Sequence, residues 1–123
     1  MTENISYHDA EINSIQKVDH TLLLGGLLAN NTPFIIRFDN VIGWDLEPFE
    51  EQNVIFDIRN YAVSQIPKWI KEDFEIPVQY FDCLNSGRYQ FYFIESSVGL
   101  CGYIIASDLI QESTTGETTN AEL

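Results

Sequence analysis

Residues 49–61, FEEQNVIFDIRNY, pass from an acidic turn into the clearest strand pattern of the chain. Side chains of a β-strand point alternately to its two faces. One face of this strand would hold Val54, Phe56 and Ile58, and the other Ile55, Asp57 and Arg59. We expect the first face to be buried and the second to present a carboxylate and a guanidinium.

The residues before this stretch predict a meander of short antiparallel strands. Strands are expected over residues 10–18, 21–28, 34–39 and 41–46. Asp19-His20 suits a tight turn between the first two. The third strand should bury Phe34, Ile36 and Phe38, and the fourth should bury Trp44.

The residues after this stretch predict one short helix and further strands. Pro67 suits the first turn of a helix and Pro77 stops it, so a helix is expected near residues 67–74. Strands are expected over residues 78–83, 88–95 and 98–106. A turn signal at residues 85–87 would join the first two. Residues 88–95 are apolar on both faces, which predicts a central strand.

Together these elements predict a mainly β or α+β domain. It would contain an antiparallel sheet of about seven or eight strands and one short helix near residues 67–74. We expect residues 1–110 to form a single globular domain. Residues 111–123 are mostly polar, rich in Thr and Glu, and contain no aromatic residue, so we expect a disordered acidic C-terminal tail.

The chain is strongly acidic: its 123 residues carry 19 acids and 6 bases, a formal net charge of −13. A field of this sign repels nucleic acid and anionic membranes and attracts basic proteins. We therefore expect a basic protein partner, no nucleic acid and no membrane, with solubility alone as the alternative reason for the charge. The first ten residues contain no basic residue and no apolar run, and no apolar stretch approaches the roughly 20 residues that span a bilayer. The sequence thus predicts a cytoplasmic protein.

Histidines beside carboxylates are the best catalytic candidates, and the residues concerned are His8, Asp9, Glu11 and His20. A metal-dependent or hydrolytic site would need these groups to converge, whereas neighbours on a strand point to opposite faces. Neither Cys83 nor Cys101 has a basic or histidine neighbour in sequence that would activate its thiol. We therefore expect no enzymatic activity, no metal and no cofactor. An enzyme built on the four candidate residues is the alternative.

Two acidic clusters, each close to a tryptophan, supply the candidate binding residues. Carboxylates steer a basic partner during association, and aromatic side chains anchor it. The predicted partner-binding residues are Trp44, Asp45, Glu47, Glu50, Glu51, Trp69, Glu72, Asp73 and Glu75. The alternative is that the acids form a solvated rim around aromatic core residues.

Three short segments resemble a group of small acidic bacterial proteins: YHDAE at residues 7–11, QNVIFD at residues 52–57 and GYIIA at residues 102–106. Those proteins open with a His-Asp element, continue as a strand meander and carry a central Gln-Asn-Val-Ile-x-Asp-like strand. Most of them are uncharacterised, and some are taken to be immunity proteins because they are encoded beside bacterial toxins. The resemblance implies a shared strand meander over most of residues 7–106, and none of its motifs is catalytic.

Charge and resemblance together predict a small acidic cytoplasmic binding protein. The predicted role is that of an immunity-type inhibitor, which neutralises a basic toxin such as a nuclease through a carboxylate-rich surface. Two alternatives stay open at this point: the enzyme described above, and a structural β protein that self-associates through an exposed sheet edge. The sequence leaves the oligomeric state open.

Overall fold

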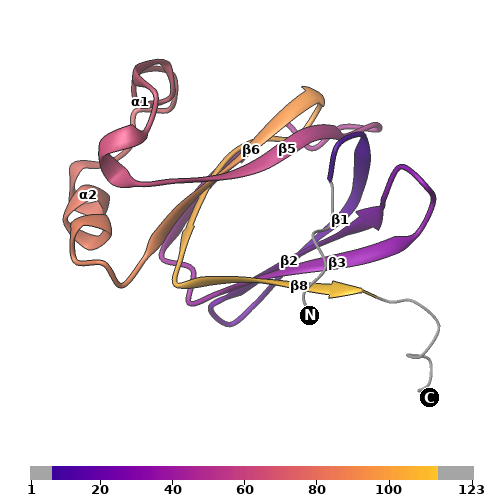
Figure 1. Cartoon of the computed structure of the whole chain (residues 1–123), viewed down its shortest axis with the longest axis horizontal. Helices are drawn as coiled ribbons and strands as arrows, with labels where there is room; N and C mark the ends of the chain where they lie inside the picture. The colour runs from indigo at the N-terminus through magenta and orange to yellow at the C-terminus, as the bar shows by residue number, and fades with distance from the viewer. Residues whose placement is uncertain (1–6, 114–123) are drawn as a thin grey trace.

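Eight antiparallel strands form one curled sheet in the computed structural model, which describes residues 7–113 (Figure 1). The strands are β1 (Ala10–Val18), β2 (Thr21–Leu27), β3 (Pro33–Asp39), β4 (Gly43–Glu47), β5 (Val54–Tyr61), β6 (Gln90–Val98), β7 (Cys101–Ala106) and β8 (Asp108–Ser113). Between β5 and β6 lie a single 3-10 turn, η1 (Val63–Gln65), and two helices, α1 (Lys68–Phe74) and α2 (Val78–Asn85). The strands pair in the order β4-β7-β6-β5-β1-β2-β3-β8. The predicted fold class is therefore confirmed.

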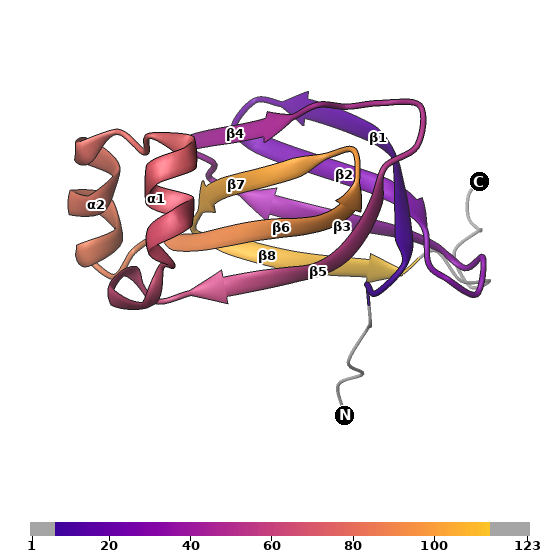
Figure 2. The ribbon, with the colours of Figure 1, turned by 90° about the horizontal axis from the view of Figure 1, so that it is seen from above.

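The sheet curls because each of its end strands continues another strand around a bend. The end strand β4 follows β3, and the end strand β8 follows β7. Asp39 pairs with Asp108 on one side of this bend, and Gly43 pairs with Ile105 on the other. The two strand pairs therefore act as one long antiparallel ribbon, bent where β3 passes into β4 (Figure 2).

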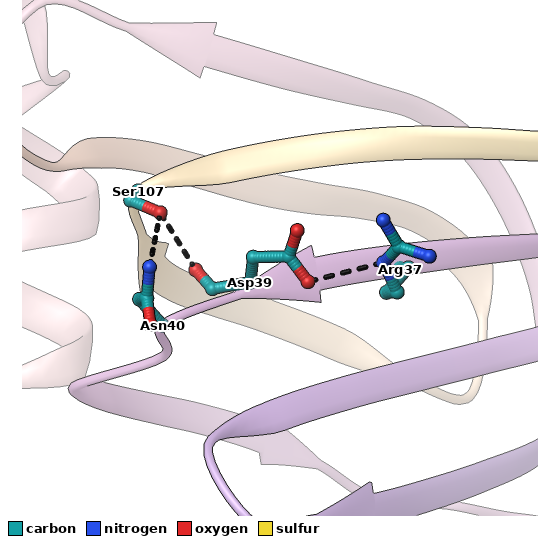
Figure 3. A network of polar contacts seen from close by, with 4 residues as sticks. All are labelled: Arg37, Asp39, Asn40 and Ser107. Atoms are coloured by element: carbon teal, nitrogen blue, oxygen red, sulfur yellow. Dashed lines mark hydrogen bonds and ion pairs between the residues drawn. The ribbon is translucent and has the colours of Figure 1, made fainter.

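A small polar network fixes this corner, as Figure 3 shows. The Ser107 N–H and the Ser107 hydroxyl both donate to the carbonyl oxygen of Asp39, at 2.9 and 3.2 Å. The side-chain amide of Asn40 donates to the Ser107 hydroxyl at 3.1 Å. Arg37 Nε donates to Asp39 Oδ1, also at 3.1 Å. Asn40 has a φ of 53°, a left-handed conformation that Asn tolerates better than most residues.

The curled sheet has a core on each side of its β6–β7 region. The first core fills the inside of the curl and contains the predicted inward residues Phe34, Ile36 and Phe38. The second core lies between the outer face of β6 and β7 and the two helices. β6 contributes Phe93 to the second core and Ile94 to the first, so the prediction of a central strand buried on both faces is confirmed.

The helical region differs in part from the prediction. A helix over residues 67–74 was expected, and α1 confirms it. The strand expected over residues 78–83 is wrong, because these residues belong to helix α2. Tyr80 and Leu84, one helical turn apart, both pack on the second core, so burial follows a helical period there. The turn at residues 85–87 accordingly ends a helix, with the Ser86 N–H donating to the carbonyl of Asp82 at 3.2 Å.

β5 also departs from the predicted alternation of faces. Ile55 is fully buried and Phe56 is 41% exposed, so the expected buried face is wrong. The register of β5 against β6 shifts on both sides of Ile55, which marks bulges that redirect the side chains. The expected burial of Trp44 is also wrong: 41% of the residue is exposed, since it lies on the end strand β4, beside which residues 7–113 place no further strand.

The C-terminal boundary lies slightly later than expected. β8 extends to Ser113 and pairs with β3, so residues 111–113 belong to the sheet. The rest of the predicted tail, residues 114–123, lies outside the described residues. Within residues 7–113, no helix has the length and apolar character needed to cross a membrane.

Asn53 is the buried polar residue that ties the β4–β5 loop to the sheet, with 1% of its surface exposed. Its side-chain oxygen accepts the N–H groups of Glu50, at 2.8 Å, and Leu100, at 3.0 Å. Its side-chain nitrogen donates to the carbonyls of Glu50, at 2.7 Å, and Ile12, at 3.3 Å. One amide therefore links three segments that are distant in sequence.

Replacing this amide should destabilise the whole domain. We expect Asn53→Ala to lower the free energy of unfolding by about 2–4 kcal/mol, because it leaves several buried backbone groups without partners. Urea unfolding measures this loss. The matched control, Asn60→Ala at an exposed position of β5, should change stability by no more than about 0.5 kcal/mol. Equal losses in the two variants would contradict the assignment.

The buried tyrosines should make the fold sensitive to alkali. Burial raises the pKa of Tyr7, Tyr92 and Tyr103 from 10.0 to about 12, with a further contribution from Asp108 at Tyr92 and from Asp45 at Tyr103. An unfolded chain would ionise these phenols near pH 10, whereas the native state keeps them neutral. Their contribution is therefore fully present below about pH 10 and is lost as the pH rises toward about 12.

Tyr7→Phe tests this expectation, because it keeps the ring and removes the ionisable group. The Tyr7 hydroxyl has no hydrogen-bond partner among the described residues, so stability near neutral pH should hardly change. Between about pH 10 and 12 the variant should lose less stability than the parent protein in urea unfolding. Identical alkaline losses would show that Tyr7 does not contribute.

Candidate partner-binding surface

The outer face of the β4-β7-β6-β5 half of the sheet is only partly covered. Helices α1 and α2 lie at one end of these strands, and the strands extend well beyond them (Figure 2). Under the helices, β6 and β7 place Phe91, Phe93, Tyr103 and Ile105 in the second core. The residues that follow on the same face lie beyond the helical layer.

A row of carboxylates crosses this uncovered part of the face. Glu47 on β4 pairs with Cys101 on β7, and Glu95 on β6 pairs with Asp57 on β5. The β6–β7 register, which pairs Ile94 with Gly102, places Glu95 and Cys101 next to each other. We call Glu47, Glu95 and Asp57 the acidic row. In the adjacent row Asp45 pairs with Tyr103, and Phe93 pairs with Arg59.

The thiol of Cys101 lies between these carboxylates. Burial raises the pKa of the thiol, hydrogen bonds with Ser96 oppose this rise, and the nearby charges of Glu95 and Glu47 add smaller increases. A thiolate is the reactive form of cysteine, so this environment keeps Cys101 unreactive. The same effect shows that both carboxylates act on one point of the face.

Arg59 is the cation beside the acidic row. Its Nε donates to Glu95 Oε1 at 2.7 Å, and its Nη1 lies 3.8 Å from Asp57 Oδ2. The hydrogen bond to Glu95 raises the pKa of the guanidinium, and the charges of Glu95 and Asp57 raise it further. Arg59 thereby allows two carboxylates to face each other across β5 and β6, where like charges would otherwise repel.

Trp69 borders this surface on the side of the helices. Its ring makes an edge-to-face contact with Phe93, with ring centroids 5.5 Å apart, and 48% of the residue is exposed. Phe93 pairs with Arg59, so an accessible aromatic ring lies near the charged residues. An exposed indole beside carboxylates can bury an apolar side chain of a protein partner while the charges pair with its bases.

The structure brings together some of the predicted partner-binding residues and separates others. Asp45, Glu47 and Trp69 belong to the surface described above. Glu50 and Glu51 are exposed in the loop after β4, and Glu72, Asp73 and Glu75 are exposed on and after α1. Trp44 lies on the opposite face, because its neighbour Ile104 points into the first core. The two tryptophans therefore cannot anchor one and the same contact.

Glu95 and Asp57 were not among the residues that sequence reasoning selected for this surface. Their convergence depends on the pairing of β5 with β6, which lie far apart in the chain. One signal was available in the sequence. Glu95 continues the alternation that starts with Phe91 and Phe93, so it had to share their face of the strand.

The candidate catalytic residues do not converge. His8 and Asp9 lie together before β1, with His8 Nδ1 3.4 Å from Asp9 Oδ2. His20 lies in the turn after β1, so roughly 30 Å of strand path separates the two histidines. Glu11 instead lines an open surface pocket of about 320 Å³ with Glu51 and Gln52. Within residues 7–113, no group of three or more His, Cys, Asp or Glu residues is placed to hold a metal ion.

Comparison with known proteins adds no family to these observations. No family model matches the chain, and neither the curated proteins nor the solved structures contain a match.

Removing Arg59 should expose the repulsion within the acidic row. We expect Arg59→Gln to lower the free energy of unfolding by roughly 0.5–1 kcal/mol at low salt, since Asp57 and Glu95 would then face each other uncompensated. Urea unfolding at about 50 mM and about 1 M NaCl measures the effect, which should shrink as salt screens the charges.

Lys68→Gln provides a matched loss of one positive charge elsewhere. Lys68 lies 3.8 Å from Glu72 on an exposed face of α1, where an ion pair contributes little. Its effect on stability should be smaller than that of Arg59→Gln. A salt-independent loss in Arg59→Gln would mean that packing of the side chain, and not charge, is what the substitution removes.

Proposed function

We propose that this chain is a small acidic binding protein of the immunity type. It neutralises a basic protein toxin, such as a nuclease, by occupying the toxin's cationic surface with the carboxylates of the β4-β7-β6-β5 face. The inhibitor would act in the cytoplasm, where a nuclease toxin would otherwise do harm.

One observation carries this proposal. Carboxylates from three strands of a single rigid sheet lie on an uncovered face that also borders an exposed tryptophan. A nuclease surface that binds phosphates is lined with Lys and Arg, and fixed carboxylates can pair with the same groups. The overall charge of −13 adds long-range attraction, which accelerates the encounter.

The other two predicted functions have less support. The enzyme would require convergence of His8 and His20, which lie at opposite ends of β1. Self-association of β4 edges would place Asp45 and Glu47 of one copy beside the same residues of another, and like charges in such pairs are destabilising.

Association with the toxin should depend steeply on salt. The binding partner for this test would be a toxin domain encoded next to the gene of this protein. We expect its association rate constant, measured by stopped-flow fluorescence, to fall at least about tenfold between about 50 and 500 mM NaCl, because salt screens steering by charge. An association rate that ignores ionic strength would count against the proposal, as would the absence of any toxin gene beside it.

Paired variants locate the effect on the proposed face. Asp45→Asn/Glu47→Gln and Asp19→Asn/Asp108→Asn change the net charge equally, but only the first pair lies on that face. The first should slow association and weaken binding about tenfold or more, and the second should cause only the small loss expected from net charge. Equal effects would mean that overall charge, and not this face, attracts the partner.

A further inference from the structure

β4 is an end strand whose second edge is open. In the strand order it is bonded only to β7. Among the described residues, the backbone hydrogen bonds outside the regular strand pairs include none to Trp44 or Leu46. An unpaired strand edge offers a row of N–H and C=O groups to any extended segment that can lie beside it.

The direction of the backbone groups of β4 follows from its contact with Gly102. A Cβ atom at Gly102 would collide with the carbonyl oxygen of Asp45, so that carbonyl points toward β7. Backbone groups in an antiparallel pair point alternately toward the partner strand and away from it. The N–H and C=O groups of Trp44 and Leu46 therefore point to the open edge.

The side chains along this edge differ between its two faces. Asp45 and Glu47 lie on the outer face with the acidic row, while Leu46 packs against the first core on the inner face. Trp44 lies on the same face as Leu46 and is 41% exposed. A strand added here would have every second side chain beside carboxylates and the intervening ones beside an indole.

We propose that the open edge of β4 binds an extended segment of a basic protein, with Lys or Arg at alternate positions and apolar residues between them. This inference rests on the proposed function, whose partner it describes more closely. Backbone hydrogen bonds to Trp44 and Leu46 would hold the segment. Ion pairs with Asp45 and Glu47 would select its charge and fix its register.

Charge distinguishes this occupant from a second copy of the chain. Two β4 strands placed edge to edge would bring four carboxylates together, which is destabilising. Acidic side chains on a short edge strand are a recognised protection against self-pairing. The same side chains attract a basic segment, so the edge is closed to its own copies and open to a basic partner.

The test uses synthetic peptides with alternating lysine and valine, KVKVKVKV, and the complete protein. Two derivatives carry methyl groups on the backbone nitrogens of either the valines or the lysines, which removes one set of N–H donors without changing charge. Only one of the two sets of N–H groups can face β4. One derivative should therefore lose about tenfold or more in affinity, measured by calorimetry, and the other should not. A peptide with its four lysines together, KKKKVVVV, should bind more weakly than the alternating one.

Hydrogen exchange provides the second measurement. The alternating peptide should slow exchange of the Trp44 and Leu46 amides at least about tenfold, and exchange at Leu24 on β2, between β1 and β3, should stay unchanged. Equal binding by the two methylated peptides, or no protection at Trp44 and Leu46, would overturn the proposal. Dimerisation by light scattering without peptide binding would also overturn it, in favour of a second copy.

These results separate this inference from the function on which it rests. If the peptides fail but the neighbouring toxin domain binds with a salt-dependent rate, the edge is not used and the acidic face remains the binding surface. If the toxin domain also fails to bind, both proposals are wrong.

Discussion

Four hydrogen bonds of the Asn53 side chain set how the strands and loops of the sheet meet. Its amide is buried and fully engaged, and it joins β1, the β4–β5 loop and the residue that precedes β7. A buried amide without these partners would be costly, so the three segments can pack only in the arrangement that satisfies it. Gly99 allows this close approach, since a Cβ atom there would collide with the Asn53 side chain.

This constraint also sets the position of the acidic surface. The loop that Asn53 holds leads out of β4, which carries Asp45 and Glu47, and into β5, which carries Asp57. At the other end of the same strands the helices cover the outer face through Phe91 and Phe93. The uncovered area is what remains between the fixed loop and the helical layer. Charged residues occupy it because nothing among residues 7–113 buries it.

The sequence predicts an element correctly where its local pattern determines the structure, and incorrectly where residues distant in the chain determine it. β3 was predicted correctly because its alternation is regular and its inner face is fully buried. α2 was not, because Val78, Tyr80 and Phe81 favour strands locally and the second core imposes the helix. In β5 the alternation fails at bulges set by pairing with β6. The acidic row depends on the same pairing, so local patterns could supply Glu47 and the face of Glu95, but not the meeting of Glu95 with Asp57.

Rigidity of the platform explains why a few carboxylates can matter on a chain that carries 19 acids. β6 is buried on both faces, and Arg59 holds Glu95 and Asp57 in defined positions. Side chains that are already ordered lose little conformational entropy on binding, whereas fully exposed side chains must be ordered by the partner. In the proposed complex, for equal charge, the acidic row would therefore contribute more to affinity than the loop residues Glu50 and Glu51. The loop residues would act mainly on the rate of encounter, because steering depends on the field and not on fixed geometry.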